Sequence, residues 1–202
     1  MKALSIKCKG GIIMKKDLGV KPYLFPMPVL MIATYGENDK VDVMNMAWGG
    51  ICDNNKVALN ITESHKTSKN IKERGAFTIS IADIDHLEES DFFGTASGNT
   101  MEDKFERTGM TAVKSSRVDA PIIEEYPITL ECKVIKIQND ELGFRVIGEI
   151  VNVIADEKVL DEKGNVDPSK LNAFVFDQFK NGYYKIGKKV GDAWKSGQKF
   201  MK

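Results

Sequence analysis

The chain has 202 residues, and its 29 lysines and arginines are balanced by 29 aspartates and glutamates. With 42% hydrophobic and 29% charged residues, the composition is near the average for a globular domain and excludes an intrinsically disordered chain. The net charge of zero argues against nucleic acid as a partner, because a broad basic surface is needed to attract it. The length predicts a single domain with at most a modest extension.

Cysteine and histidine are too sparse for a disulfide framework or a metal site. The three cysteines are far apart in the sequence and form no Cys-x-x-Cys pair, and only His65 and His86 are present. No apolar run approaches the roughly 20 residues that span a bilayer, and the N-terminal segment lacks the apolar core of a secretory signal. We therefore expect no metal, no membrane partner and a cytoplasmic protein.

Alternation of apolar and polar residues predicts most of the strands. Three prolines in residues 21–28 predict an extended lead-in to a strand over 29–35. The stretches 56–62 and 77–82 alternate, which predicts two strands that each bury one face. A strand over 128–138 changes its apolar phase at Ile135, which predicts a β-bulge. A hairpin turn at 139–143 then leads into a returning strand over 144–155.

Helices are predicted over residues 67–74, 83–93 and 101–108, and Gly75 has the position of a C-terminal cap for the first. The strands outnumber these helices and are not separated by regular crossover helices. This pattern favours an antiparallel barrel with inserted helices over a doubly wound parallel sheet. The fingerprints of Rossmann dehydrogenases, P-loop nucleotide hydrolases, zinc proteases and serine hydrolases are all absent.

Residues 60–71 combine hydroxyl groups, two lysines and the predicted start of a helix. The hydroxyls belong to Thr62, Ser64, Thr67 and Ser68, and the lysines are Lys66 and Lys69. Free N–H groups and the helix dipole favour an anion at such a position, so the segment is a candidate phosphate site. Ordinary N-capping by Ser64 or Thr67, with both lysines in solvent, explains the same residues equally well.

Two further segments have the composition of a ligand-binding surface. Asn45, Trp48 and the glycine pair that follows offer amide groups, a large ring and close backbone approach to a flat heteroaromatic ligand. A buried tryptophan beside a glycine-rich bend is the simpler alternative. Residues 93–99 are small or hydroxylated, and they either line a ligand or form a plain loop. Cys52 lies near the first segment, and we interpret it as a small buried hydrophobe.

In this order and spacing, the segments resemble the flavin reductase-like family of FMN-binding split barrels, which includes the flavoredoxins. The resemblance extends over residues 18–191. The motifs that carry it are Pro26-Met27-Pro28-Val29, Asn45-Met46-Ala47-Trp48, Ser64-His65-Lys66-Thr67 with Asn70-Ile71, Gly94-Thr95-Ala96-Ser97-Gly98, Asp103-Lys104-Phe105, Gly148-Glu149-Ile150 and Gly182-Tyr183-Tyr184-Lys185-Ile186-Gly187.

The resemblance implies a mainly β fold, namely a six-stranded antiparallel Greek-key split barrel with short inserted helices. Residues 18–202 would form this domain, and residues 1–17 would be an N-terminal extension. It also implies a homodimer with one FMN per subunit near the dimer interface. The phosphate would be held by Thr62, Ser64, His65, Lys66 and Thr67. The isoalloxazine ring would be lined by Asn45, Met46, Ala47 and Trp48, with Ser80, Ala96, Ser97 and Gly98 close by.

The implied function is that of an FMN-binding oxidoreductase, either an NAD(P)H-dependent flavin reductase or an electron carrier of the flavoredoxin kind. Its redox partner would be NADH, NADPH or a small redox protein, and no general acid or base can be named from the sequence. The alternative is a non-catalytic module that stores or senses flavin. Many relatives carry a histidine shortly after the Gly-Glu-Val/Ile motif, where this chain has Val153-Ile154-Ala155. A role of that imidazole in nicotinamide contact therefore cannot be transferred to this chain.

Overall fold

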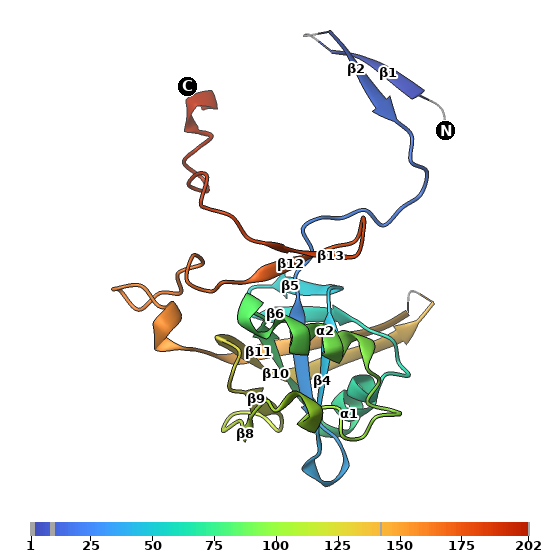
Figure 1. The fold of residues 1–202 in the computed structure, drawn as a ribbon, viewed down its shortest axis with the longest axis vertical. Helices are drawn as coiled ribbons and strands as arrows, with labels where there is room; N and C mark the ends of the chain where they lie inside the picture. The colour runs from blue at the N-terminus through green and yellow to red at the C-terminus, as the bar shows by residue number, and fades with distance from the viewer. Residues whose placement is uncertain (1–2, 9–10, 142, 202) are drawn as a thin grey trace.

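A large antiparallel sheet dominates the computed structural model, which describes residues 3–8, 11–141 and 143–201 (Figure 1). Its seven strands are hydrogen-bonded in the order β4-β3-β7-β10-β11-β6-β5. In chain order they are β3 (Leu30–Tyr35), β4 (Val41–Met46), β5 (Gly49–Asp53), β6 (Lys56–Asn60), β7 (Ala76–Ile81), β10 (Ile128–Asp140) and β11 (Gly143–Ala155). The chain is therefore mainly β, with seven strands in the main sheet where the resemblance implied six.

The two edges of this sheet are joined by a very short connection. β4 and β5 are the edge strands, although only Ala47 and Trp48 separate them in the chain. A link of two residues spans at most about 10 Å. The edge strands must therefore approach each other where β4 ends and β5 begins, and the sheet curls on itself. Within the described residues, no hydrogen-bonded ladder joins β4 to β5, so the curled sheet is not a closed barrel.

Three small hairpins and two α-helices surround the sheet. The hairpins pair β1 (Ala3–Cys8) with β2 (Gly11–Lys16), β8 (Ala112–Lys114) with β9 (Pro121–Ile123), and β12 (Phe174–Asp177) with β13 (Gly182–Lys185). The helices are α1 (Lys66–Arg74) and α2 (Leu87–Thr95). Short 3-10 turns are η1 (Glu37–Asp39), η2 (Ile84–His86), η3 (Glu106–Thr108), η4 (Glu157–Val159) and η5 (Gln198–Phe200). The β1–β2 hairpin and the C-terminal segment both extend away from the main sheet (Figure 1).

Both faces of the sheet are covered, as the alternation along β3 illustrates. Leu30 and Ile32 pack in one cluster, which also contains Phe77. Met31 and Ala33 point to the opposite face and pack in a second cluster, which includes Phe93 of α2 and Phe105, Ile123 and Phe174. The central strands are thus buried on both sides, between the interior of the curled sheet and a layer formed by α2 and the segments that follow it.

Most of the strand predictions are confirmed. β6 buries Val57 and Leu59, with Ile61 just beyond its end, as the alternation predicted. The register between β10 and β11 shifts between Val134 and Lys136, which confirms the bulge at Ile135.

The prediction that β7 buries only one face is wrong, because Thr78 and Ser80 are also fully buried. Their hydroxyls are hydrogen-bonded to the Pro121 carbonyl and to Thr129, which satisfies both polar groups away from water.

The helix predictions are confirmed in part. α1 ends at Gly75, whose φ of 64° places it in the left-handed region, as its capping position predicted. The predicted helix over residues 83–93 divides into η2 and α2. The helix predicted over residues 101–108 is wrong. This segment forms turns and the short 3-10 turn η3, and the Thr108 hydroxyl donates to the carbonyl of Phe105, the N-cap of η3.

The described part of the chain contains no helix long and apolar enough to cross a membrane.

Candidate functional site

Three neighbouring cavities lie where β4, the start of α1 and the loop after α2 meet. The α1 cavity, of about 250 Å³, is lined by Asp42, Met44, Asn45, His65, Lys66, Thr67, Phe93, Gly94, Thr95, Ala96, Ser97, Gly98 and Lys104. The Trp48 cavity, of about 220 Å³, is lined by Asn45, Met46, Ala47, Trp48, Asp91, Gly94, Thr95, Phe176 and Tyr183. The two adjoin, because they share Asn45, Gly94 and Thr95. The outer cavity, of about 400 Å³, lies on the other side of Lys66, Gly98 and Lys104.

The start of α1 has no side-chain cap. The N-cap residue is His65, and it makes no side-chain hydrogen bond to the helix. The first backbone N–H groups of an α-helix have no partner within the helix, so those of α1 are available to an anion. The hydroxyl of Thr67 donates to Asp42 Oδ2 over 2.6 Å, and both residues are buried. Ordinary capping by Ser64 or Thr67 is therefore wrong, and Thr67 can offer a ligand its backbone N–H but not its hydroxyl proton.

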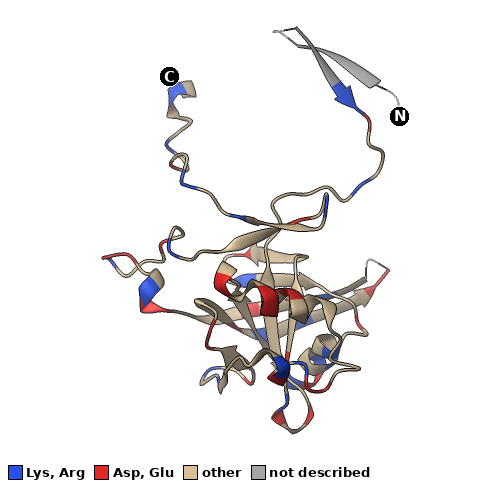
Figure 2. Cartoon of the chain, in the orientation of Figure 1, with Lys and Arg blue, Asp and Glu red and all other residues tan. Residues whose placement is uncertain are grey.

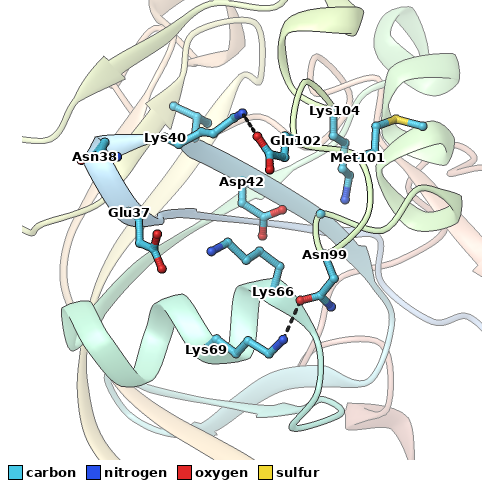
Figure 3. Close-up of a pocket in the computed structure, with 12 residues that line it drawn as sticks. Glu37, Asn38, Lys40, Asp42, Lys66, Lys69, Asn99, Met101, Glu102 and Lys104 are labelled. Atoms are coloured by element: carbon cyan, nitrogen blue, oxygen red, sulfur yellow. Dashed lines mark hydrogen bonds and ion pairs between the residues drawn. The ribbon is translucent and has the colours of Figure 1, made fainter.

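The loop that follows α2 is tied to the start of α1. Asn99 donates from Nδ2 to the Ser64 carbonyl over 2.9 Å. It also accepts from the Lys69 amine over 2.7 Å, as Figure 3 shows. A Cβ atom at Gly98 would lie 2.3 Å from Asp42 Oδ1 and 3.2 Å from the Lys66 side chain. Only glycine permits this approach, which brings Ala96, Ser97 and Gly98 to the wall of the α1 cavity. The segment thus lines a cavity, and its role in binding a ligand stays a prediction.

Aromatic side chains form the wall of the Trp48 cavity. Trp48 is 49% exposed, so the interpretation of a buried tryptophan is wrong. Its ring centroid lies 6.4 Å from that of Phe176. Asn45 is oriented by a hydrogen bond from its Nδ2 to the Ser90 carbonyl of α2 over 3.0 Å. The short β4–β5 connection therefore presents an open aromatic surface beside an amide whose position is set by α2.

Tyr183 closes the far side of the Trp48 cavity. Its hydroxyl donates to Asp91 Oδ1 over 2.8 Å and joins β13 to α2. Burial, together with the neighbouring Asp91 carboxylate, raises the pKa of Tyr183 to about 12. The phenol is therefore protonated at neutral pH, and this hydrogen bond is retained.

The structure brings together most of the predicted site residues, but not Ser80, Thr62 or Ser64. Ser80 does not line the α1 or Trp48 cavity, because it is fully buried in β7, where its hydroxyl is 2.8 Å from that of Thr129. Its expected place close to the flavin ring therefore has no support from the cavity lining and stays a prediction. Thr62 and Ser64 also do not line these cavities, and their carbonyls accept hydrogen bonds that shape the turn before α1.

Other residues at the cavities received no role in the sequence analysis. They are Asp42, Met44, Lys104, Asp91, Phe176 and Tyr183. Lys104 and Tyr183 do belong to the motifs that carried the family resemblance, and that was the available signal. Asp42 and Phe176 had no such signal, because they approach the site only through the pairing of β3 with β4 and of β12 with β13.

Cys52 is exposed on β5, so its interpretation as a buried hydrophobe is wrong. His86 is not at the site, and its Nδ1 lies 2.6 Å from Asp83 Oδ1 at the start of η2.

The lysines of the α1 and Trp48 cavities gather at one end, and Asp91 is the charged residue that lines the other. Lys66 and Lys104 line the α1 cavity together with the carboxylate of Asp42, whereas the Trp48 cavity is aromatic and contains no cation. An anionic group at the α1 end and a flat aromatic group at the Trp48 end would each meet complementary side chains. Free helix N–H groups and two lysines next to an exposed indole are the donor set that a ring with a phosphorylated tail requires.

Comparisons with known proteins identify the family to which this fold belongs. The Flavin reductase like domain matches residues 23–179. The flavoredoxin of Desulfovibrio vulgaris (Miyazaki F) is 34% identical, with a TM-score of 0.87 over 91% of this chain and 100% of its own. A flavoredoxin from Methanosarcina acetivorans superposes with a TM-score of 0.83 over 93% of this chain and 100% of its own, at 22% identity.

An uncharacterised protein of Archaeoglobus fulgidus is 30% identical over 147 residues, which are 72% of this chain and 81% of that protein. Together with the curled antiparallel sheet, these matches confirm the expected family and its split-barrel type of fold. The chain therefore belongs to the flavin reductase-like family, a family of flavin-binding oxidoreductases.

Proposed function

We propose that this protein is an FMN-containing oxidoreductase that exchanges electrons or hydride with a redox partner. One observation carries the proposal: an aromatic cavity and a cationic cavity adjoin at Asn45, Gly94 and Thr95 in a chain that is 34% identical to a flavoredoxin. The flavin ring would lie against Trp48 and Asn45, and its phosphate would lie at the start of α1 beside Lys66. Together the two cavities fall within the roughly 300–1,000 Å³ of small-molecule sites.

FMN itself supplies the redox chemistry, and the protein supplies binding, orientation and electrostatics. Asn45 is oriented by α2 and offers its carbonyl oxygen to a ring N–H. Trp48 and Tyr183 both line the Trp48 cavity, and Tyr183 is held there by its hydrogen bond to Asp91. No side chain at the cavities is required as a general acid or base.

The electron donor decides between a reductase and a carrier, and an anaerobic reduction experiment tests it. The protein loaded with FMN is mixed with NADH, with NADPH or with a reduced ferredoxin-type protein, and the flavin absorbance is recorded. Bleaching by a nicotinamide nucleotide would identify a flavin reductase, and reduction by the redox protein alone would identify a flavoredoxin-like carrier. No reduction by any donor would contradict the proposal and would favour the alternative, a module that stores or senses flavin.

We further propose a homodimer in the cytoplasm, with neither nucleic acid nor a membrane as a partner. Apolar side chains on three strands support association, because Ile51 of β5, Ile135 of β10 and Val153 of β11 are each about half exposed or more, at 66%, 49% and 51%. Acidic and basic residues are interspersed along the chain, with an acidic α2, which does not favour a nucleic-acid surface (Figure 2).

A further inference from the structure

The C-terminal arm, residues 187–201, follows β13 and extends away from the main sheet (Figure 1). Its backbone turns on itself, because the Asp192 carbonyl accepts the N–H groups of Lys195 and Ser196. An ion pair joins Lys189 to Asp192. Within the described part of the chain, the arm forms no hydrogen bond or ion pair with a residue outside it. It therefore has a local shape of its own but no polar contact that holds it to its own domain.

The apolar side chains of the arm are exposed to solvent. Trp194 is 95% exposed, and Val190, Phe200 and Met201 are each at least 82% exposed. Single exposed apolar residues are normal on a protein surface, but four of them in one short segment that extends away from the domain are unusual. Such a segment indicates a surface on another molecule that would cover these side chains.

Lysines give the arm a positive charge, whereas the domain that precedes it is acidic. The arm contains four lysines and one aspartate. Residues 17–186 contain 19 lysines and arginines but 28 aspartates and glutamates, although the charges of the whole chain balance. Figure 2 shows basic residues along the arm and acidic residues along α2. The domain itself therefore offers the opposite charge that would attract the arm.

A stretch of acidic residues without lysine or arginine covers η2 and α2. Residues 83–91 contain five aspartates and glutamates. Glu88 and Glu89 lie in the first turn of α2, and neither forms an ion pair with a described lysine or arginine. Asp91 lines the Trp48 cavity together with Trp48, whose ring is half exposed. This face thus combines unpaired carboxylates with an exposed ring, and the arm combines lysines with exposed rings.

The arm leaves β13 in the direction opposite to α2 of its own chain (Figure 1), so the matching surface is that of a second copy. We propose that the C-terminal arm docks on the outer face of α2 of a second copy. Its lysines would lie beside Glu88 and Glu89, and Trp194 would cover the apolar surface near Trp48. This inference rests on the proposed homodimer and assigns the segment that stabilises it. In a two-fold dimer each copy gives an arm and receives one, so the contact forms twice.

Reversing charges in the full-length protein tests the contact between copies. The arm variant combines Lys188→Glu with Lys195→Glu, and the α2 variant combines Glu88→Lys with Glu89→Lys. Each variant alone places like charges opposite each other in both contacts of its dimer. We expect analytical ultracentrifugation at low ionic strength to give a dissociation constant about 10-fold higher or more for each variant dimer. High salt should reduce this difference, because it screens exposed charges.

An equal mixture of the two variants is the decisive measurement. In a mixed dimer the acidic arm meets the basic α2 and the basic arm meets the acidic α2, so association should return to the wild-type level. Lys114→Glu with Arg117→Glu is the matched control, because both residues are exposed at or near β8 and the net charge changes as in the arm variant. This control should leave association unchanged.

The fluorescence of Trp194 gives an independent readout. Comparison of the wild type with Trp194→Phe separates its emission from that of Trp48. We expect Trp194 to be protected from the quencher acrylamide in the concentrated protein and accessible after dilution to single chains. If the α2 variant does not fold, Glu88→Gln with Glu89→Gln takes its place and should weaken association to a smaller extent.

Several results would overturn the docking of the arm. They are unchanged association of the arm variant, no recovery in the mixture, and equally weakened association of the control. Protection of Trp194 that persists in single chains would place the arm on its own domain, and protection only with vesicles of anionic phospholipid would place it on a membrane. A dimer that binds FMN and fails these tests contradicts this inference alone. Failure to bind FMN contradicts the proposed function and leaves the charge-reversal results valid.

Discussion

Asp42 is the residue on which the charged end of the site is organised. Its carboxylate accepts the Thr67 hydroxyl, lies against Gly98 and attracts Lys104, so one buried side chain connects β4, α1 and the loop after α2. A carboxylate beside the proposed phosphate site is unfavourable by itself, but here it offsets part of the positive charge of Lys66 and Lys104. The hydrogen bond between Thr67 and Asp42 holds the first turn of α1 and leaves the backbone N–H groups of that turn free for an anion.

Replacing Lys66 by alanine tests the phosphate contact at the exposed side of the same site. A charge-assisted hydrogen bond contributes roughly 1.5–3 kcal/mol, so Lys66→Ala should weaken FMN binding about 10- to 150-fold. Riboflavin lacks the phosphate and should bind the variant as it binds the wild type. Lys72→Ala is the matched control, because Lys72 is at the opposite end of α1 and is paired with Glu63. If titration of both flavins shows unchanged FMN affinity for Lys66→Ala, the phosphate assignment of Lys66 is wrong.

Patterns over a few neighbouring residues were sufficient to predict several elements of the fold. β6, α1 with Gly75, and the bulge at Ile135 all follow from alternation, capping or a change of phase along a few residues. The burial of the second face of β7 does not follow from such a pattern. It depends on partners 43 and 49 residues away, which form hydrogen bonds with the hydroxyls of Thr78 and Ser80. The same limit explains why Lys104 received no role, since its burial at the α1 cavity is a property of the folded chain.

Gly148 in β11 illustrates a constraint that one element places on another. A Cβ atom at this position would lie 2.5 Å from Cζ of Phe77, which is fully buried in the interior cluster. Phe77 cannot move without disturbing that cluster, so Gly148→Ala should lower the free energy of unfolding by roughly 1–3 kcal/mol. Gly50→Ala on β5 is the control, because a Cβ atom there would meet nothing within 4 Å. Urea denaturation that gives equal stability for the two variants would contradict the packing argument.

At the scale of the whole molecule, association of two chains is expected to cover exposed apolar side chains. Ile51, Ile135 and Val153 are exposed on β5, β10 and β11, and Trp48 opens toward solvent beside the Trp48 cavity. A single chain has a mass of 22.5 kDa. We predict that light scattering of the protein with FMN bound gives twice this mass, and that the mass persists on dilution. A mass of one chain with FMN still bound would show that the site is complete without a partner.

The central claim is that each chain binds one FMN in the adjoining α1 and Trp48 cavities. Analysis of the purified or reconstituted protein tests it most directly, by measuring flavin absorbance against protein concentration and identifying the released cofactor by mass spectrometry. We expect one flavin per chain with the mass of FMN, because the start of α1 offers room for one compact phosphate site. Release of chiefly FAD, or no flavin after reconstitution, would contradict it.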